Sequence, residues 1–130
     1  MSLKTSTICL VGTCLLYATA AFAVDTQVSK GAPDLTSVRA KIKVKDFKAA
    51  IAELQPMLDT HQHADVYNLL GFSLRKSGNM ASAATFYAKA LDFDADHKGA
   101  LEYQGEMFVE MGQLDKANVG VQRIIRLNSQ

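Results

Sequence analysis

The chain has 130 residues, of which 48% are hydrophobic, with 14 lysines and arginines against 13 aspartates and glutamates. This length is enough for one small domain with a single core and too short for two domains. The charges nearly balance, so no overall field would favour nucleic acid or an anionic membrane, and charge indicates no partner.

Residues 1–23 have the pattern of a secretory signal peptide. Lys4 precedes an uncharged, apolar run over residues 8–18, and residues 21–23 place small side chains where a signal peptidase would cleave. We therefore expect cleavage before Val24. The mature chain is then expected to be periplasmic or secreted, with no stable membrane insertion.

An uncleaved membrane anchor is the alternative for this segment, because the uncharged stretch over residues 5–24 is just long enough to span a bilayer. Both cysteines, Cys9 and Cys14, lie in the segment. After cleavage the fold would be held by packing alone, without disulfides. Residues 24–33 are expected to form a flexible lead-in.

Beyond this lead-in the sequence repeats itself with a period of about 34 residues. Similar residues recur at this distance in the pairs Tyr67 and Leu101, Gly71 and Gly105, Leu74 and Phe108, Gly78 and Gly112, Met80 and Leu114, Ala83 and Ala117, and Ala90 and Ile124. A period of this length, with one supersecondary unit per repeat, is typical of a helix-turn-helix solenoid. The chain is therefore expected to be all-α.

Residues 34–63 match the period less well and form a degenerate unit. Apolar residues that mark its second helix stand one period before their equivalents in the next unit, at Phe47, Ala50, Leu54 and Met57. Its first helix would use Leu35, Val38 and Ile42, but both glycines of the pattern are missing. The run "KIKVK" alternates like a strand, and we expect helix there because the repeat outweighs so short an alternation. Pro56 is expected to kink or shorten the second helix.

Residues 64–97 form the first complete unit. Their apolar residues fall into two sets with helical spacing, first Tyr67, Leu70, Gly71 and Leu74, then Ala83, Phe86, Tyr87, Ala90 and Leu91. Gly78 lies between the sets, where a helix end favours a residue that tolerates positive φ. Gly71 lies within the first helix, where glycine costs about 1 kcal/mol relative to alanine. We therefore expect a second helix, with the small Ala83 and Ala90 on it, to cross close to Gly71.

The complete units resemble the tetratricopeptide repeat (TPR) family. Residues 64–97 carry its signature as Tyr67-x-x-Leu70-Gly71-x-x-Leu74 followed by Gly78, Ala83, Tyr87 and Ala90. Residues 98–130 resemble a second copy, with Leu101-x-x-Gln104-Gly105-x-x-Phe108 followed by Gly112, Ala117 and Val121, although Gln104 replaces an apolar residue. The stretch "HKGALEYQGE" is similar to small exported bacterial TPR proteins. The resemblance implies a right-handed helical solenoid of about three TPR units.

No arrangement of nucleophile and base can be read from the sequence, so an enzyme is not expected. Asp92, Asp94 and Asp96 alternate like the start of a calcium loop. An EF-hand would need glycine in place of His97 and glutamate in place of Tyr103. We interpret the stretch as an acidic turn between repeats.

His61 and His63 offer two imidazoles, but no cysteine or fixed third ligand lies nearby in the sequence. A solvated turn is favoured over a metal site. We therefore expect no metal and no cofactor.

In TPR proteins the first helix of each unit lines a concave groove, so the resemblance implies a surface for a protein or peptide. On this alignment the groove receives Asp65, Asn68, Phe72, Arg75 and Lys76 from residues 64–97, Gly99, Glu102, Glu106, Val109 and Glu110 from residues 98–130, and Thr36, Ala40 and Lys43 from the degenerate unit. Phe72 lies off the apolar stripe of its helix and is either a binding anchor or a filler of the core.

Charged residues near this groove allow two interpretations. The glutamates at positions 102, 106 and 110 are either a solvated face or, opposite Arg75 and Lys76, one half of a groove of split polarity. The basic run Arg39, Lys41, Lys43, Lys45 and Lys48 is spread around its helix, which favours a role in solubility over lipid contact.

The last helix carries apolar residues with little chain after it to cover them. We call Val121, Ile124 and Ile125 the C-terminal edge. Repeat arrays need their last face covered, so this edge is expected to self-associate or to dock on a partner.

Together these features predict a non-enzymatic protein-interaction module, an exported TPR adaptor or assembly factor that binds a protein or peptide in its groove. The alternative is a structural scaffold that self-associates through the C-terminal edge. No contact with nucleic acid is expected.

Overall fold

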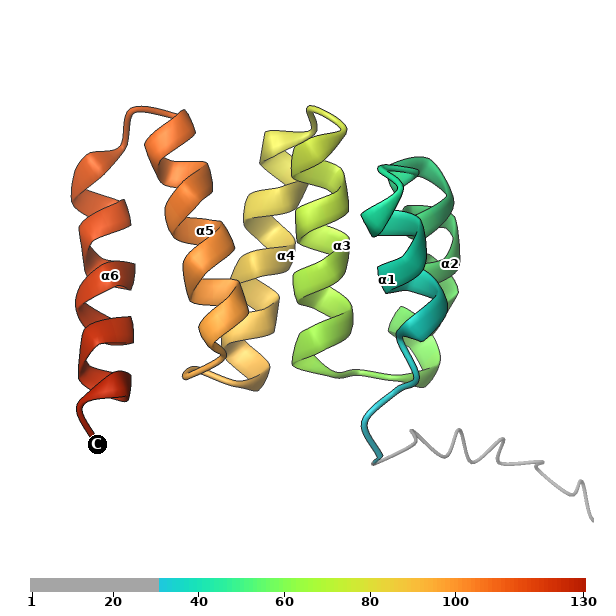
Figure 1. The fold of residues 1–130 in the computed structure, drawn as a ribbon, viewed down its shortest axis with the longest axis horizontal. Helices are drawn as coiled ribbons and strands as arrows, with labels where there is room; N and C mark the ends of the chain where they lie inside the picture. The colour runs from blue at the N-terminus through green and yellow to red at the C-terminus, as the bar shows by residue number, and fades with distance from the viewer. Residues whose placement is uncertain (1–30) are drawn as a thin grey trace, which may run out of the picture.

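The computed structural model describes residues 31–130, which fold into six α-helices with no strand in that range (Figure 1). The helices are α1 (Thr36–Lys43), α2 (Phe47–Thr60), α3 (Ala64–Lys76), α4 (Met80–Phe93), α5 (Lys98–Glu110) and α6 (Leu114–Asn128). The prediction of an all-α chain is confirmed for this part. The expected signal peptide and most of the lead-in lie outside the described residues.

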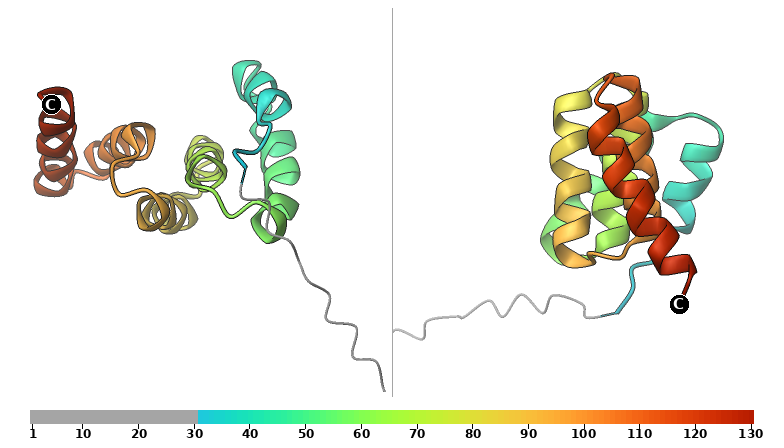
Figure 2. Two further views of the ribbon diagram at one scale, coloured as in Figure 1. Left: turned by 90° about the horizontal axis from the view of Figure 1, so that it is seen from below. Right: turned by 90° about the vertical axis from the view of Figure 1, so that its left-hand side faces the viewer.

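The helices form a row with short turns between them, in which α3 to α6 follow one another in chain order and α1 lies in front of α2 (Figure 1). The pair α1–α2 and the pair α5–α6 form opposite ends of the row. Seen from below, α1, α3 and α5 lie on one side of the row and α2 and α4 on the other (Figure 2). Each helix packs against its neighbours in the chain, and α3 also contacts α5. No helix between residues 31 and 130 is long and apolar enough to cross a membrane.

The same turn follows α1, α3 and α5. Lys45, Gly78 and Gly112 occupy it with positive φ values of 62°, 87° and 71°. The residue after each of them donates its backbone N–H to a carbonyl near the end of the preceding helix, as Asn79 does to Leu74 at 2.9 Å. This bond is typical of a Schellman helix end. The prediction that Gly78 ends a helix is confirmed, and Lys45 takes the place of glycine in the degenerate unit.

The helices after these turns also begin alike. Asp46 and Asn79 cap α2 and α4 by accepting the backbone N–H groups of Ala49 and Ser82, each at 3.1 Å. Gln113 stands at the same point before α6, without a side-chain cap bond. Helix α4 begins one sequence period after α2, and α6 begins one period after α4. The helix starts therefore follow the period of the sequence.

Gly71 lies where α3 and α4 cross closely. A Cβ atom placed on it would come within 2.9 Å of Cδ1 of Tyr87 and 3.3 Å of the carbonyl oxygen of Ala83. The predicted close crossing is therefore confirmed. Gly105, its equivalent in α5, has neither a side chain nor a backbone atom of this kind within 4 Å, so α5 and α6 do not cross as closely there.

The core runs along the row and thins toward its C-terminal end. The largest cluster joins α1, α2 and α3, and its buried residues are Leu35, Val38, Ala50, Leu54, Val66, Leu69 and Leu70. Two smaller clusters join α3 and α4 to α5 through Ala100 and Met107. In α6 only Ala117 is buried. The last helix therefore packs on α5, its Arg123 also pairs with Asp96 in the turn before α5, and its outer side is uncovered in the described chain.

The degenerate unit is helical as predicted. In the run "KIKVK" the first three residues end α1, and Val44 and Lys45 form the turn. Pro56 was expected to kink or shorten α2. The shortening is wrong, because α2 has 14 residues, as many as α4, and the kink stays a prediction. Met57 and Leu58, which follow the proline, pack against the core. Their burial holds the last turn although Pro56 removes one backbone hydrogen bond.

Candidate protein-binding site

A pocket of about 420 Å³ opens where the end of α1, the start of α2 and the end of α3 meet. We call it the Phe72 pocket, and its lining residues are Ile42, Lys43, Lys45, Phe47, Phe72 and Lys76. The rings of Phe47 and Phe72 meet edge to face, with centroids 6.2 Å apart. The pocket thus combines an aromatic wall with lysine side chains.

Phe72 is half-buried and touches both the pocket and the core. Its ring lies 4.7 Å from that of Tyr103 in α5, measured between centroids. Nζ of Lys76 lies 5.5 Å from its centroid, which is within cation–π range. Phe72 therefore packs between α2 and α5, and it also lines an open pocket. Its role as a binding anchor stays a prediction.

The sequence interpretation separated the basic run of the degenerate unit from the site, and the structure joins them. Lys43 and Lys45 line the same pocket as Lys76. The reason is the turn after α1, where positive φ at Lys45 reverses the chain beside α3. The period could have revealed this grouping, because Lys43 stands one period before Lys76 and Lys45 stands one period before Gly78.

Arg75 was expected to line the groove as an accessible cation, but its side chain is only 1% exposed. It donates hydrogen bonds to Glu106 at 2.5 Å and to Glu110 at 2.8 Å. Burial of Arg75 lowers the pKa of its guanidinium. The hydrogen bond that Arg75 donates to Glu106 and the nearby negative charges outweigh burial, so the pKa is raised. Arg75 therefore ties α3 to α5 and is not free to bind a partner.

Asn68 is likewise buried, at 4% exposure, between α3 and the start of α5. A Cβ atom on Gly99 would lie 3.1 Å from its amide nitrogen. Asp65 is more exposed, and its Oδ1 lies 3.0 Å from Nε2 of His97. Both residues thus belong to the α3–α5 contact rather than to an open surface.

The remaining predicted groove residues lie on the surface. Lys76 is exposed at the end of α3, and Glu102, Glu106 and Val109 are exposed along α5. Glu106 keeps 49% of its side chain in solvent while it pairs with Arg75. The face of α1, α3 and α5 therefore presents lysines at the Phe72 pocket and carboxylates along α5.

The histidines serve as helix caps. His63 accepts the backbone N–H of Asp65 at 3.2 Å, and His97 accepts that of Ala100 at 3.0 Å, each through Nδ1. A neutral His97 then carries its proton on Nε2 and donates it to Asp65. Between residues 31 and 130 no group of three or more His, Cys, Asp or Glu side chains is placed to hold a metal ion.

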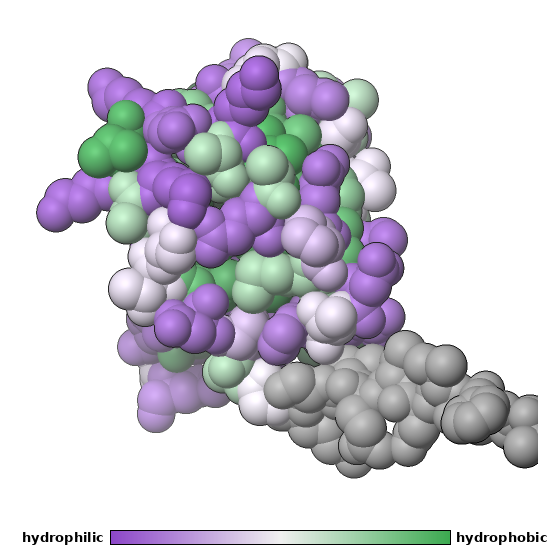
Figure 3. Space-filling model, turned by 90° about the vertical axis from the view of Figure 1, so that its right-hand side faces the viewer, coloured by the Kyte–Doolittle hydropathy of each residue, from purple (hydrophilic) through white to green (hydrophobic). Residues whose placement is uncertain are grey.

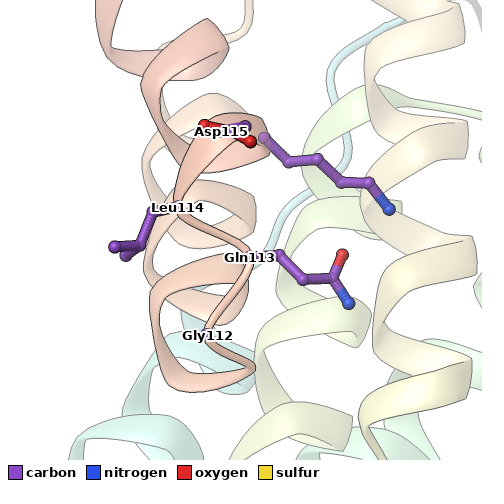
Figure 4. A pocket seen from close by; sticks show the side chains of 5 residues that line it. Gly112, Gln113, Leu114 and Asp115 are labelled. Carbon is purple, nitrogen blue, oxygen red and sulfur yellow. The ribbon is translucent and has the colours of Figure 1, made fainter.

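A second pocket lies at the turn between α5 and α6, where residues 112–116 line it. Gln113 and Leu114 point to opposite sides of this turn (Figure 4). Leu114 is exposed. With one turn as its lining, this pocket gathers no chemical groups from distant parts of the chain.

The C-terminal edge is open, as expected from the sequence. Val121 and Ile125 are 47% and 55% exposed, and Ile124 is half-buried. Val121 and Ile124 help to line a groove of about 260 Å³ between α5 and α6. This groove lies at the opposite end of the row from the Phe72 pocket.

The fold and these surfaces define an all-α protein of packed helix pairs. No protein-family model matches the chain. It is similar to uncharacterized protein ycf37 of Pyropia yezoensis, with 30% identity over 119 residues that cover 82% of this chain and 67% of that protein. The chain belongs to the family of that protein. The description of the relative names no activity and no partner.

Proposed function

We propose that the chain is a non-enzymatic protein-interaction module of the TPR class, a right-handed solenoid of about three helix-turn-helix units. The recurrence of the positive-φ turn at Lys45, Gly78 and Gly112 supports this architecture, because these turns stand one sequence period apart. The helix caps at Asp46 and Asn79 support it in the same way. TPR units lack catalytic groups of their own and act by binding.

The Phe72 pocket carries the proposal for where binding occurs. Its aromatic wall would bury an apolar side chain of a partner, and aromatic residues are common anchors in protein interfaces. Lys43, Lys45 and Lys76 line the same pocket. They would attract acidic residues on either side of that apolar residue. The partner is therefore a protein segment with an apolar residue flanked by aspartate or glutamate.

The carboxylates on α5 would set the direction of the bound segment. Glu106 and Glu110 share the single charge of Arg75, so this part of the face keeps negative charge. A segment with its acidic end at the Phe72 pocket and a basic or neutral end along α5 fits both regions. This arrangement would be the groove of split polarity that the sequence allows, with the lysines of the Phe72 pocket as its basic half in place of Arg75.

We also propose that the protein works as an adaptor or assembly factor in the periplasm or an equivalent exported space. The signal-like pattern of residues 1–23 is the support for this location. Intact mass of the protein from cells tests it. A mass that begins at Val24 supports export with cleavage, and a mass that includes residues 1–23 rejects it in favour of a retained segment.

Self-association as a structural scaffold is the second candidate function. The observation in its favour is the exposure of Val121 and Ile125 at the C-terminal edge. Sedimentation of the purified protein over a wide concentration range separates the two functions, because a scaffold gains mass with concentration and an adaptor does not.

A peptide library tests the Phe72 pocket directly. Peptides selected on the purified protein should converge on an apolar residue flanked by acidic residues, and their binding should weaken about tenfold or more in Phe72→Ala and in Lys76→Glu. Phe93→Ala is the matched control, since Phe93 is also a partly exposed phenylalanine but lies at the end of α4. Selected peptides that bind Phe72→Ala as well as the unchanged protein would reject this site.

A further inference from the structure

The C-terminal end of the row has a groove that the Phe72 pocket does not involve. Its apolar lining consists of Leu101, Gly105 and Val109 from α5 and Ala117, Val121 and Ile124 from α6. We call it the α5–α6 groove. Val109 and Val121 are 56% and 47% exposed, so the groove leaves apolar side chains in water at an energetic cost.

This groove matches the surface on which α5 itself packs. Each apolar residue of the α5–α6 groove has an equivalent one period earlier, on α3 or α4. These equivalents are Tyr67, Gly71, Arg75, Ala83, Tyr87 and Ala90. In the structure α5 covers that surface. Ala100 packs with Tyr67 and Ala90, and Met107 packs with Ala83 and Tyr87. The α5–α6 groove therefore has the form of a helix-binding surface whose helix is absent from the described chain.

The charges of the two surfaces differ in sign. On the surface that α5 covers, Arg75 supplies a positive charge to Glu106 and Glu110 of α5. At the equivalent of Arg75 the α5–α6 groove has the uncharged Val109, and Glu102 and Glu106 are among its lining residues. A helix that lies in this groove must therefore bring positive charge where α5 brings negative charge.

We propose that the α5–α6 groove binds a basic amphipathic helix of a partner protein, which packs on α5 and α6 as α5 packs on α3 and α4. Its apolar face fills the groove between Gly105 and Val121. Its lysines or arginines face Glu102 and Glu106. This inference concerns a second surface that shares Glu106 with the first site, where Glu106 pairs with Arg75 and keeps 49% of its side chain exposed, and it does not depend on the Phe72 pocket.

The helices of a second copy of this chain fit the groove less well. The sequence period places Thr36 and Ala40 of α1 where α5 has Tyr103 and Met107, so α1 offers no large apolar side chain at these two positions. Hydrophilic residues are spread over the α1–α2 end of the molecule (Figure 3). A second copy of α5 would bring its own glutamates against Glu102 and Glu106. A second copy of α6 is basic, with Lys116, Arg123 and Arg126, but its Ala117, Val121 and Ile124 are themselves part of the groove lining. A helix of another protein meets both requirements with an apolar face of its own.

A designed peptide serves as the probe. It is a labelled helical peptide of about four turns, with alanine, leucine and methionine at the spacing of Ala100, Tyr103 and Met107 and lysines on its other face. A twin peptide carries glutamates in place of the lysines. Fluorescence anisotropy should show the basic peptide binding about tenfold or more tightly than its twin, with the difference reduced by added salt.

Two substitutions on α6 locate the binding surface. Val121→Glu places a carboxylate in the groove and should weaken binding of the basic peptide about tenfold or more. Val119→Glu is the matched control, because Val119 is exposed on the same helix but does not line the groove, and it should leave binding unchanged. Phe72→Ala should also leave it unchanged, which separates this proposal from the Phe72 pocket.

Four results would overturn the proposal: equal binding of the two peptides, no binding of either, equal effects of the two valine substitutions, or a dimer of the protein that Val121→Glu dissociates. The last result would assign the groove to a second copy of the chain. Circular dichroism of each variant confirms that these exposed positions tolerate glutamate.

Discussion

The same substitution at two equivalent glycines should change stability in opposite directions. Gly71 and Gly105 both lie inside helices, one sequence period apart. In a helix interior, replacing glycine by alanine raises the free energy of unfolding by about 1 kcal/mol, and this applies to both positions. At Gly105 nothing lies within 4 Å of the new Cβ atom, so we expect the Gly105→Ala variant to keep this gain.

At Gly71 the new methyl group meets a packed interface. It would lie 2.9 Å from Cδ1 of Tyr87, where contacts between carbon atoms are ordinarily about 3.5–4.0 Å. Tyr87 is fully buried and the carbonyl oxygen of Ala83 is close, so the two helices must move apart. Such overpacking costs about 3 kcal/mol at the upper end of its usual range. The net effect of Gly71→Ala is then a loss of about 2 kcal/mol.

Urea unfolding followed by circular dichroism measures both free energies on the same scale. The two variants should differ by about 3 kcal/mol, with unchanged dependence on urea concentration. In thermal unfolding, each 1 kcal/mol corresponds to roughly 4–8 °C for a domain of this size. Equal stabilisation by both substitutions would refute the close crossing of α3 and α4 at Gly71.

Other substitutions test single features of the fold. Lys45→Gly should raise the free energy of unfolding by about 1 kcal/mol in urea titrations, because glycine adopts positive φ without steric cost; no gain would mean that the turn after α1 is not left-handed. The double variant Glu106→Gln/Glu110→Gln leaves Arg75 buried without a counter-ion and should cost about 2 kcal/mol after allowance for partial exposure. Arg75→Met should cost less than that double variant, since a long apolar side chain replaces the buried charge, and the reverse order in thermal melts would contradict a buried Arg75 whose charge depends on the two glutamates. His97→Ala removes the cap of α5 and a bond to α3, for an expected loss of about 2 kcal/mol; hydrogen exchange faster at the start of α5 than elsewhere should accompany it.

The period of the sequence predicted the helices well, because it depends on few residues with strict steric roles. Gly78 ends a helix and Gly71 permits a close crossing, and both requirements can be recognised in the sequence. The left-handed turn at Lys45 could not be recognised by residue type, since lysine there is tolerated only at a steric cost. Sequence position alone, one period before Gly78, would have indicated it.

The candidate site was harder to predict because its residues meet only through tertiary packing. The sequence left Phe72 as either a binding anchor or a filler of the core, and in the structure it is half-buried and lines the Phe72 pocket. Lys76 follows Phe72 on the same helix, but Lys43 and Lys45 come from α1 and the turn after it. The periodicity of a single helix contains no information on contacts with another helix. The pairing of Arg75 with Glu106 and Glu110 likewise joins residues that are 31 and 35 positions apart in the sequence. Burial of that arginine could therefore not be predicted from its own helix.

The most direct test of the proposed function is photo-crosslinking in cells from a probe at Phe72. The matched probe at Phe93 reports background capture from the other side of the row. We predict that the Phe72 probe captures one defined protein, and that capture is lost when Lys43 and Lys76 are both changed to glutamate. The same adducts from both probes, or adducts formed only with other copies of this chain, would contradict the Phe72 pocket as a partner-binding site.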